Sequence, residues 1–154
     1  MAYNILPRLY LGDRNDAIRD DVPNKYDVVI NCTPDIPFHP ELVESQRIRL
    51  NLIDIPDISE NNKMYDLIKP TIETIDDILH TSKTMNILVH CYMGRQRSAA
   101  IVAAYIMYRY NTTANEAIIF IKNKKPDAFF GSVTFINALF RWQTEIQKPL
   151  GNAA

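Results

Sequence analysis

The sequence predicts an α/β fold in which a central, mostly parallel, twisted sheet of about four to five strands is flanked by helices. Residues 26–32 and 86–90 are short, nearly continuous apolar runs, which is typical of strands buried on both faces of a parallel sheet. Longer segments with apolar residues at helical spacing follow these runs. Strands that alternate with helices along one chain indicate a layered α/β architecture.

The individual elements follow from the same patterns. We expect strands at residues 8–11, 26–32, 47–53 and 86–90, the first of them at a sheet edge. We expect a short helix capped by Asp13 and ending at Ile18, and a long helix capped by Asn62 and ending near His80. We predict three further helices: one that begins near Arg97, one from Thr113 to Lys122 and one from Val133 to Ile146.

Length and composition narrow the class of protein. The 154 residues suit a single domain, 1–154, and the net charge of −1 gives no general attraction to nucleic acid or to membranes. Two cysteines are too few for a disulfide framework, which fits a reducing compartment. The sequence shows neither a signal peptide nor a membrane-spanning run. We therefore expect a cytoplasmic protein that is a monomer or a weak dimer.

The segment from His90 to Ser98, HCYMGRQRS, joins a predicted buried strand to a predicted helix. Backbone N–H groups that precede a helix N-terminus form an anion site, and Gly94 permits the tight turn that such a site requires. Arg97 lies six positions after Cys91, where its guanidinium can grip two phosphate oxygens. These surroundings favour the thiolate form of Cys91, which is a nucleophile, and the hydroxyl of Ser98 can stabilise the sulfur as a leaving group.

The other cysteine has a simpler interpretation. Cys32 ends the apolar run YDVVINC, where a small buried hydrophobic side chain is expected. The histidines His39 and His80 have no evident partner and are interpreted as surface residues. The lysines Lys122, Lys124 and Lys125 are interpreted as a solvated helix end.

The string HCYMGRQRSA resembles the His-Cys-x5-Arg-Ser signature of the protein tyrosine phosphatases, in particular the compact dual-specificity phosphatases. Four further segments resemble elements of the same family: LPRLYLG at 6–12, VVINCTP at 28–34, residues 47–57 and IKNKKP at 121–126. The resemblance implies a compact dual-specificity phosphatase fold and a phosphocysteine intermediate on Cys91. It also implies a general acid, a loop-orienting role for His90, and no metal or cofactor.

The resemblance further implies that the backbone amides of the loop bind the equatorial phosphate oxygens together with the Arg97 side chain. The loop residues are Tyr92, Met93, Gly94, Arg95, Gln96 and Arg97. Gln96 stands where the family often has Ser, and Gly131-Ser132 stands where it often has a bracing Asn, so Ser132 is expected to substitute for that Asn.

The general acid has two main candidates in the segment LIDIPDISENN, Asp57 and Asp54, with Glu60 as a distant third. Asp57 is favoured because its separation from Cys91 is closer to the family's usual one. Asp54 is the alternative because it directly follows the strand pattern LNLI. The acid must reach the leaving oxygen of the substrate, so geometry decides between them.

The predicted substrates are phosphorylated proteins carrying phosphotyrosine and phosphoserine or phosphothreonine, because a short chain of this family suggests a shallow cleft. Arg95 adds a cation at the rim, interpreted either as a surface residue or as a contact for extra negative charge. The latter gives the alternative of a phosphoinositide or an RNA 5′-triphosphate; no other nucleic-acid partner is expected. Less favoured alternatives are a phosphate-binding pseudophosphatase and a rhodanese-like sulfurtransferase.

Overall fold

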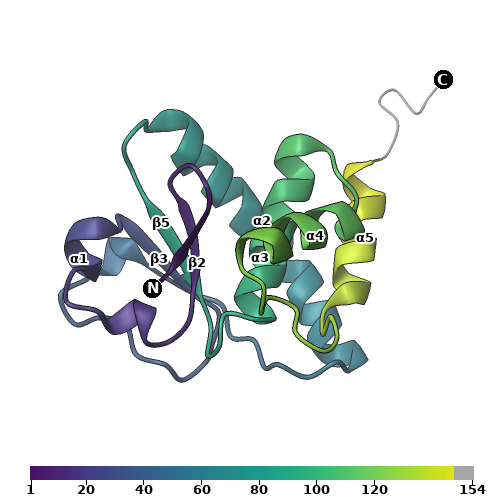
Figure 1. Cartoon of the computed structure of the whole chain (residues 1–154), viewed down its shortest axis with the longest axis horizontal. Helices are drawn as coiled ribbons and strands as arrows, with labels where there is room; N and C mark the ends of the chain where they lie inside the picture. The colour runs from purple at the N-terminus through teal and green to yellow at the C-terminus, as the bar shows by residue number, and fades with distance from the viewer. Residues whose placement is uncertain (148–154) are drawn as a thin grey trace.

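The computed structural model describes residues 1–147, in which five strands form one sheet with the order β1-β2-β5-β3-β4 (Figure 1). The strands are β1 (Tyr3–Leu6), β2 (Leu9–Gly12), β3 (Val28–Asn31), β4 (Arg47–Arg49) and β5 (Ile87–His90). Four of them are parallel, and β1 pairs with β2 in the antiparallel sense. The predicted fold class is confirmed, with a sheet that is mixed because of β1.

Five α-helices accompany this sheet in the described chain. They are α1 (Val22–Lys25), α2 (Ile58–Thr81), α3 (Arg97–Tyr110), α4 (Ala114–Lys124) and α5 (Ile136–Ile146). Figure 1 shows α3, α4 and α5 together on one side of the sheet and α1 on the other. Helix α3 is the central helix, since it contacts α2, α4, α5 and β5, and its residues 98–107 are all buried.

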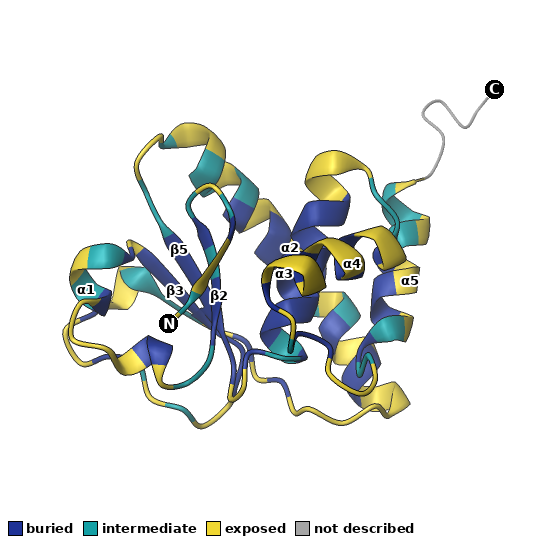
Figure 2. Ribbon diagram, in the orientation of Figure 1, coloured by how far each residue is buried: buried dark blue, intermediate teal, exposed yellow. Residues whose placement is uncertain are grey.

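The two faces of the sheet carry separate apolar clusters. Val28, Ile30 and Val89 pack toward α2 and α3 in the larger cluster. Val29 and Leu88 point to the opposite face, where the smaller cluster contains Val22 from α1. Strands β3 and β5 are therefore buried on both faces, as their apolar runs predicted (Figure 2).

Several predicted boundaries are wrong. The strand predicted at the edge, 8–11, lies inside the sheet as Leu9–Gly12, because the short strand β1 folds back on it through a turn at Arg8. The strand predicted at 47–53 ends at Arg49, since β3 ends at Asn31 and leaves the following residues without a partner strand. The helix predicted from Val133 begins at Ile136.

The long helix begins earlier than predicted. Its N-cap is Asp57, whose side chain accepts a hydrogen bond from the Glu60 backbone N–H, so the proposed cap Asn62 lies inside the helix. The cap predicted at Thr113 is confirmed, since Thr113 forms a capping box with Glu116. The short helix runs over Asp16–Ile18 with Asn15, not Asp13, at its N-cap position, although Asp13 accepts hydrogen bonds from the N–H groups of residues 15 and 16.

The structure confirms the predicted burial or exposure of two residues singled out in the sequence, and contradicts it for two others. Cys32 is fully buried, as predicted. His39 was predicted at the surface but is buried, with its Nδ1 accepting a hydrogen bond from the Glu41 N–H. Lys125 was predicted to be solvated but is also buried, because its ammonium group binds the Asp127 carboxylate at 2.6 Å. His80 is exposed, as predicted.

Within residues 1–147, no helix combines the length and the apolar character that crossing a membrane requires.

Candidate active site

Three parallel strands of the sheet end side by side. Gly12 of β2, His90 of β5 and Asn31 of β3 lie opposite one another in register. The chain leaves β5 at this row and enters α3 at Arg97, so residues 91–96 form a loop over the carboxyl edge of the sheet. In parallel α/β sheets this edge, beside a helix N-terminus, is where ligands bind.

Cys91 is the first residue of this loop. It is 3% exposed, and its Sγ lies 3.0 Å from the hydroxyl oxygen of Ser98 in the first turn of α3. Ser98 is fully buried. A hydroxyl held at this distance can donate a hydrogen bond to a thiolate, which stabilises the negative sulfur.

The loop turns tightly at Gly94. Its φ of +69° lies in the left-handed region, and a Cβ placed there would lie 2.7 Å from the Gly12 carbonyl oxygen. The loop therefore rests directly on the backbone at the end of β2, and only glycine satisfies both requirements.

Arg97 connects the anion site to the segment that carries the candidate acids. One guanidinium nitrogen, Nη1, donates to the Leu52 carbonyl oxygen at 2.9 Å. Its Nε is buried and has no hydrogen-bond partner among the described residues. A buried donor without a partner costs free energy, and an anion bound at the helix N-terminus would satisfy it.

His90 is fully buried directly beneath the loop, and its Nδ1 lies 3.4 Å from the Cys91 carbonyl oxygen. Burial lowers the pKa of His90 to about 4, against a smaller opposing effect of that backbone contact. The ring is therefore neutral at physiological pH and acts on the loop by hydrogen bonding rather than by charge.

Arg14, which follows β2, holds the outer part of the loop. Its backbone N–H donates to the Tyr92 carbonyl oxygen at 3.1 Å, and its Nη1 donates to the same oxygen at 3.2 Å. The guanidinium also lies over the Tyr92 ring, 3.9 Å from the ring centroid, and Nη1 lies 3.5 Å from the Met93 sulfur. The exposed side chains of Tyr92 and Met93 are thus fixed at the rim.

Gln96 connects the loop to the segment before α5. Its Nε2 donates to the Ser132 carbonyl oxygen at 2.6 Å, and its Oε1 accepts from the Thr134 N–H at 3.0 Å. The bracing expected from the Ser132 hydroxyl is instead made by this longer side chain, which binds the backbone of that segment. The departure from the family pattern at residue 96 and that at residue 132 therefore compensate each other.

Arg95 has partners on the same segment. Its Nε donates to Asp127 at 3.2 Å, and its guanidinium carbon lies 5.3 Å from the centroid of the exposed Phe130 ring. Lys125 binds the other carboxylate oxygen of Asp127. Burial alone would raise the pKa of Asp127, but hydrogen bonds from Lys125 and Arg95 lower it below its usual value. Two cations, Arg95 at the rim and the buried Lys125, thus share one carboxylate.

The two candidate acids lie in different environments. The two residues before Asp54 are both fixed by hydrogen bonds to their backbone. The Leu52 carbonyl oxygen accepts from Arg97, and the Ile53 N–H donates to Oε1 of the buried Glu60 at 2.8 Å. Asp57 is occupied as the N-cap of α2, with its Oδ1 2.8 Å from the Glu60 nitrogen.

Asp54 also lines a cavity of about 320 Å³ beside the loop. The other residues that line this cavity are Met93, Arg95, Gln96, Phe130, Ser132 and Thr134. Its walls therefore combine the rim of the anion site with the Asp54 carboxyl group, and Asp57 is not among them.

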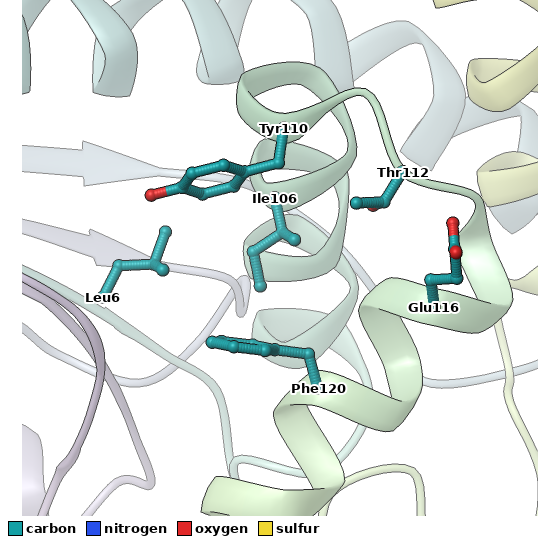
Figure 3. A pocket seen from close by; sticks show the side chains of 6 residues that line it. All are labelled: Leu6, Ile106, Tyr110, Thr112, Glu116 and Phe120. Atoms are coloured by element: carbon teal, nitrogen blue, oxygen red, sulfur yellow. The ribbon is translucent and has the colours of Figure 1, made fainter.

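Another cavity, of about 490 Å³, lies away from this loop, between the β1–β2 hairpin and helices α3 and α4 (Figure 3). It is lined by Leu6, Ile106, Tyr110, Thr112, Glu116 and Phe120. None of the sequence-predicted site residues contributes to it, so it is separate from the candidate site.

The structure brings together the loop residues 90–98 and places Asp54 at the same rim. Sequence reasoning missed Gly12, Arg14 and the supporting role of Glu60. Arg14 and Gly12 lie nearly eighty residues before the loop and reach it only through the register of β2 with β5. No local sequence signal marks that contact. The described residues contain no cluster of three or more His, Cys, Asp or Glu side chains able to hold a metal ion.

Comparison with known proteins identifies the family. Residues 9–145 match the family described as dual specificity phosphatase, catalytic domain, and the chain belongs to this family. It is 30% identical over 151 residues to human dual specificity protein phosphatase 16, covering 96% of this chain and 21% of that protein. It is 35% identical over 125 residues to human dual specificity protein phosphatase 7, covering 80% of this chain and 29% of that protein. The chain thus spans less than a third of the length of these relatives.

Solved structures show the same fold. The crystal structure of human DUSP28 superposes with a TM-score of 0.79 at 21% identity, covering 95% of this chain and 95% of that chain. The structure of DUSP15 superposes with a TM-score of 0.76 at 25% identity, covering 96% and 90% of the two chains. These comparisons agree with the predicted resemblance to the dual-specificity phosphatases.

Proposed function

We propose that this protein hydrolyses phosphotyrosine and phosphoserine or phosphothreonine in protein substrates through a phosphocysteine intermediate on Cys91. One observation carries the proposal. Cys91 and its hydrogen-bond partner Ser98 lie at the N-terminus of a single helix, α3, together with Arg97, whose Nε has no hydrogen-bond partner within residues 1–147. Family membership adds independent support for phosphatase chemistry.

In the first step the Cys91 thiolate attacks phosphorus and an S–P bond forms. The bond from phosphorus to the substrate oxygen breaks, and a carboxylic acid donates a proton to that oxygen. The loop amides and Arg97 stabilise the charge on the three equatorial oxygens. His90 stays neutral and holds the Cys91 carbonyl, which keeps the loop in place.

In the second step the same carboxylate removes a proton from water. The water oxygen attacks phosphorus, the S–P bond breaks, and inorganic phosphate leaves. The Ser98 hydroxyl, 3.0 Å from Sγ, donates a hydrogen bond to the departing thiolate. No step requires a metal or an organic cofactor.

For the acid we propose Asp54 rather than Asp57, which the sequence favoured. Asp54 lines the cavity beside the loop, and Arg97 and Glu60 fix the two residues before it. The Asp57 carboxylate is engaged at the N-cap of α2. An acid must reach the leaving oxygen, and these contacts favour Asp54 for that position.

Hydrolysis of a phosphotyrosine peptide and of para-nitrophenyl phosphate tests the proposal. Cys91→Ser should abolish turnover of both. Asp54→Asn should lower kcat for the peptide by about 10²–10⁴-fold, the usual contribution of a general acid, and should matter less for para-nitrophenyl phosphate because its leaving group needs little protonation. Asp57→Asn serves as the matched control and should stay close to wild type. Full activity of Cys91→Ser would exclude the mechanism, and a reversed order of the two aspartates would assign the acid to Asp57.

A second candidate substrate class rests on the Arg95 rim, where Arg95 and Lys125 share Asp127. Residual positive charge there would favour a phosphoinositide or an RNA 5′-triphosphate, which carry several phosphates. The discriminating measurement is kcat/KM for a phosphotyrosine peptide, a phosphoinositide and a triphosphorylated RNA, with wild type and Arg95→Gln. A peptide preference of orders of magnitude, unchanged in Arg95→Gln, would exclude this candidate.

A further inference from the structure

The catalytic steps use no residue of the cavity of about 490 Å³ between the β1–β2 hairpin and helices α3 and α4. Ile106 is the most deeply buried residue of its lining and is 3% exposed. Figure 3 shows the Tyr110 ring on one side of Ile106 and the Phe120 ring on the other. Leu6 faces these rings from the hairpin, so four of the six lining residues are apolar or aromatic. Cavities of roughly 300–1,000 Å³ with mostly apolar walls are the usual binding sites of small organic molecules.

Both aromatic walls of this cavity are accessible to solvent. Tyr110 is 54% exposed and Phe120 is 38% exposed. They belong to helices α3 and α4, which pack directly against each other, so the two rings stand on a fixed base. Single apolar side chains at a protein surface are ordinary, but two aromatic rings that share one cavity form a continuous apolar contact surface. An apolar group bound between the rings would remove both of them from water, which is favourable.

Each aromatic wall carries a cation. The Arg109 guanidinium carbon lies 5.7 Å from the centroid of the Tyr110 ring, and the Lys124 ammonium nitrogen lies 5.5 Å from the centroid of the Phe120 ring. Both cations are exposed, and neither forms an ion pair with another residue in the described range 1–147. Two cations beside one apolar cavity favour a bound molecule that carries a negative charge.

The polar residues of the lining are Glu116 and Thr112, which Figure 3 shows next to each other at one side of the cavity. Glu116 is engaged in the capping box of α4, where its Oε1 accepts the Thr113 N–H at 2.8 Å. The Thr112 hydroxyl oxygen is buried and has no hydrogen-bond partner within residues 1–147. A buried hydroxyl without a partner costs free energy, and a polar group of a bound molecule could satisfy it.

We propose that this cavity binds a small amphipathic anion, a molecule with an apolar body and one carboxylate group. The apolar body lies between the rings of Tyr110 and Phe120, and the carboxylate lies near Arg109 and Lys124. An uncharged apolar molecule would leave both cations unused, and an amphipathic cation would be repelled by them. None of these residues belongs to the loop at 90–98, so this binding is independent of the proposed phosphatase activity.

The test titrates the isotopically labelled full chain with octanoate below its micelle concentration. Octan-1-ol and octyltrimethylammonium serve as the uncharged and the cationic probe of the same chain length. Amide shifts in ¹H–¹⁵N NMR spectra locate each probe and give its Kd. Phe120→Ala removes one wall, and the double variant Arg109→Gln, Lys124→Gln removes both cations. The matched controls are Ile119→Ala, an exposed apolar residue of α4 outside the lining, and Lys69→Gln, an exposed lysine of α2. Thermal unfolding confirms that each variant is folded.

Octanoate should shift the signals of residues 106–120 and bind wild type more tightly than either other probe. Its Kd should rise about tenfold in Phe120→Ala and in the double variant, and stay near the wild-type value in both controls. Absence of binding, shifts confined to other residues, equal affinity for the three probes, or an unchanged Kd in the double variant would overturn the proposal. Signals of residues 106–120 that depend on protein concentration without any probe would identify a second copy of the chain as the occupant and would overturn it too.

Discussion

His90 shows how one buried side chain couples the anion site to stability. Its imidazole is neutral in the folded protein because burial lowers its pKa from 6.5 to about 4. In the unfolded chain the ring is solvated and protonates near its ordinary pKa. Between these two values the unfolded state binds more protons, so the free energy of unfolding must fall as the pH falls.

We therefore expect the free energy of unfolding to decrease by about 3 kcal/mol from this residue alone as the pH falls from about 7 to 4. Urea denaturation at a series of pH values measures this slope. His90→Gln, which cannot titrate, should show a flatter profile over the same range. Parallel profiles for the two proteins would contradict the assignment of the slope to His90.

The second prediction at the residue scale concerns Gly94. Gly94→Ala should be destabilised by about 1–3 kcal/mol from backbone strain and by more from overlap with the Gly12 carbonyl, and it should lose turnover. Gly131→Ala is the matched control, since Gly131 also has a positive φ, +82°, but has nothing within 4 Å of the added Cβ. The control should show strain alone and retain turnover, as measured by thermal unfolding and by para-nitrophenyl phosphate hydrolysis.

At the scale of elements, the start of α2 places the two candidate acids in different positions. Asp57 caps the helix, whereas Asp54 lies three residues before the cap. Asp57→Ala should therefore lower the free energy of unfolding by about 1 kcal/mol, the usual value of an N-cap. Asp54→Ala should change it by less than about 0.5 kcal/mol. The same two proteins should show the opposite order in turnover of a phosphotyrosine peptide, and matching orders in both assays would refute this division.

The loop at 90–98 was predictable because its chemistry lies in consecutive residues, between a strand and a helix that each carry a clear periodicity. The sequence could not decide between the two candidate acids, because Asp54 and Asp57 are three residues apart in an irregular segment whose path depends on Arg97 and Glu60. Arg14 was not predictable either, since its contact with Tyr92 exists only through strand pairing. The strand β1 is only four residues long, which left its pattern too short to interpret.

At the scale of the whole molecule, a bound oxyanion should add to the stability of the fold. The buried Nε of Arg97 lacks a partner among the described residues, so an oxyanion that occupies the site should stabilise the fold as a whole. Orthovanadate at about 100 times its Kd should raise the free energy of unfolding by about 2.7 kcal/mol.

Thermal unfolding of wild type with and without orthovanadate checks this prediction. Arg97→Met is the comparison, and its Tm should respond much less because the clamp is missing. Inorganic phosphate with Cys91→Ser repeats the measurement without a reactive sulfur. An equal rise of Tm in Arg97→Met would place the anion elsewhere on the molecule.

The register of Gly12, His90 and Asn31 also determines how accurately the strands must pair during folding. Neighbouring residues in a strand point to opposite faces, so a slip of β5 by a single residue could put the His90 imidazole where the Cys91 thiol belongs. Such a misaligned molecule could keep its helices and much of its apolar burial and still be chemically inert. Correct pairing of three short strands during folding, more than the presence of any one side chain, thus decides which atom meets the phosphorus.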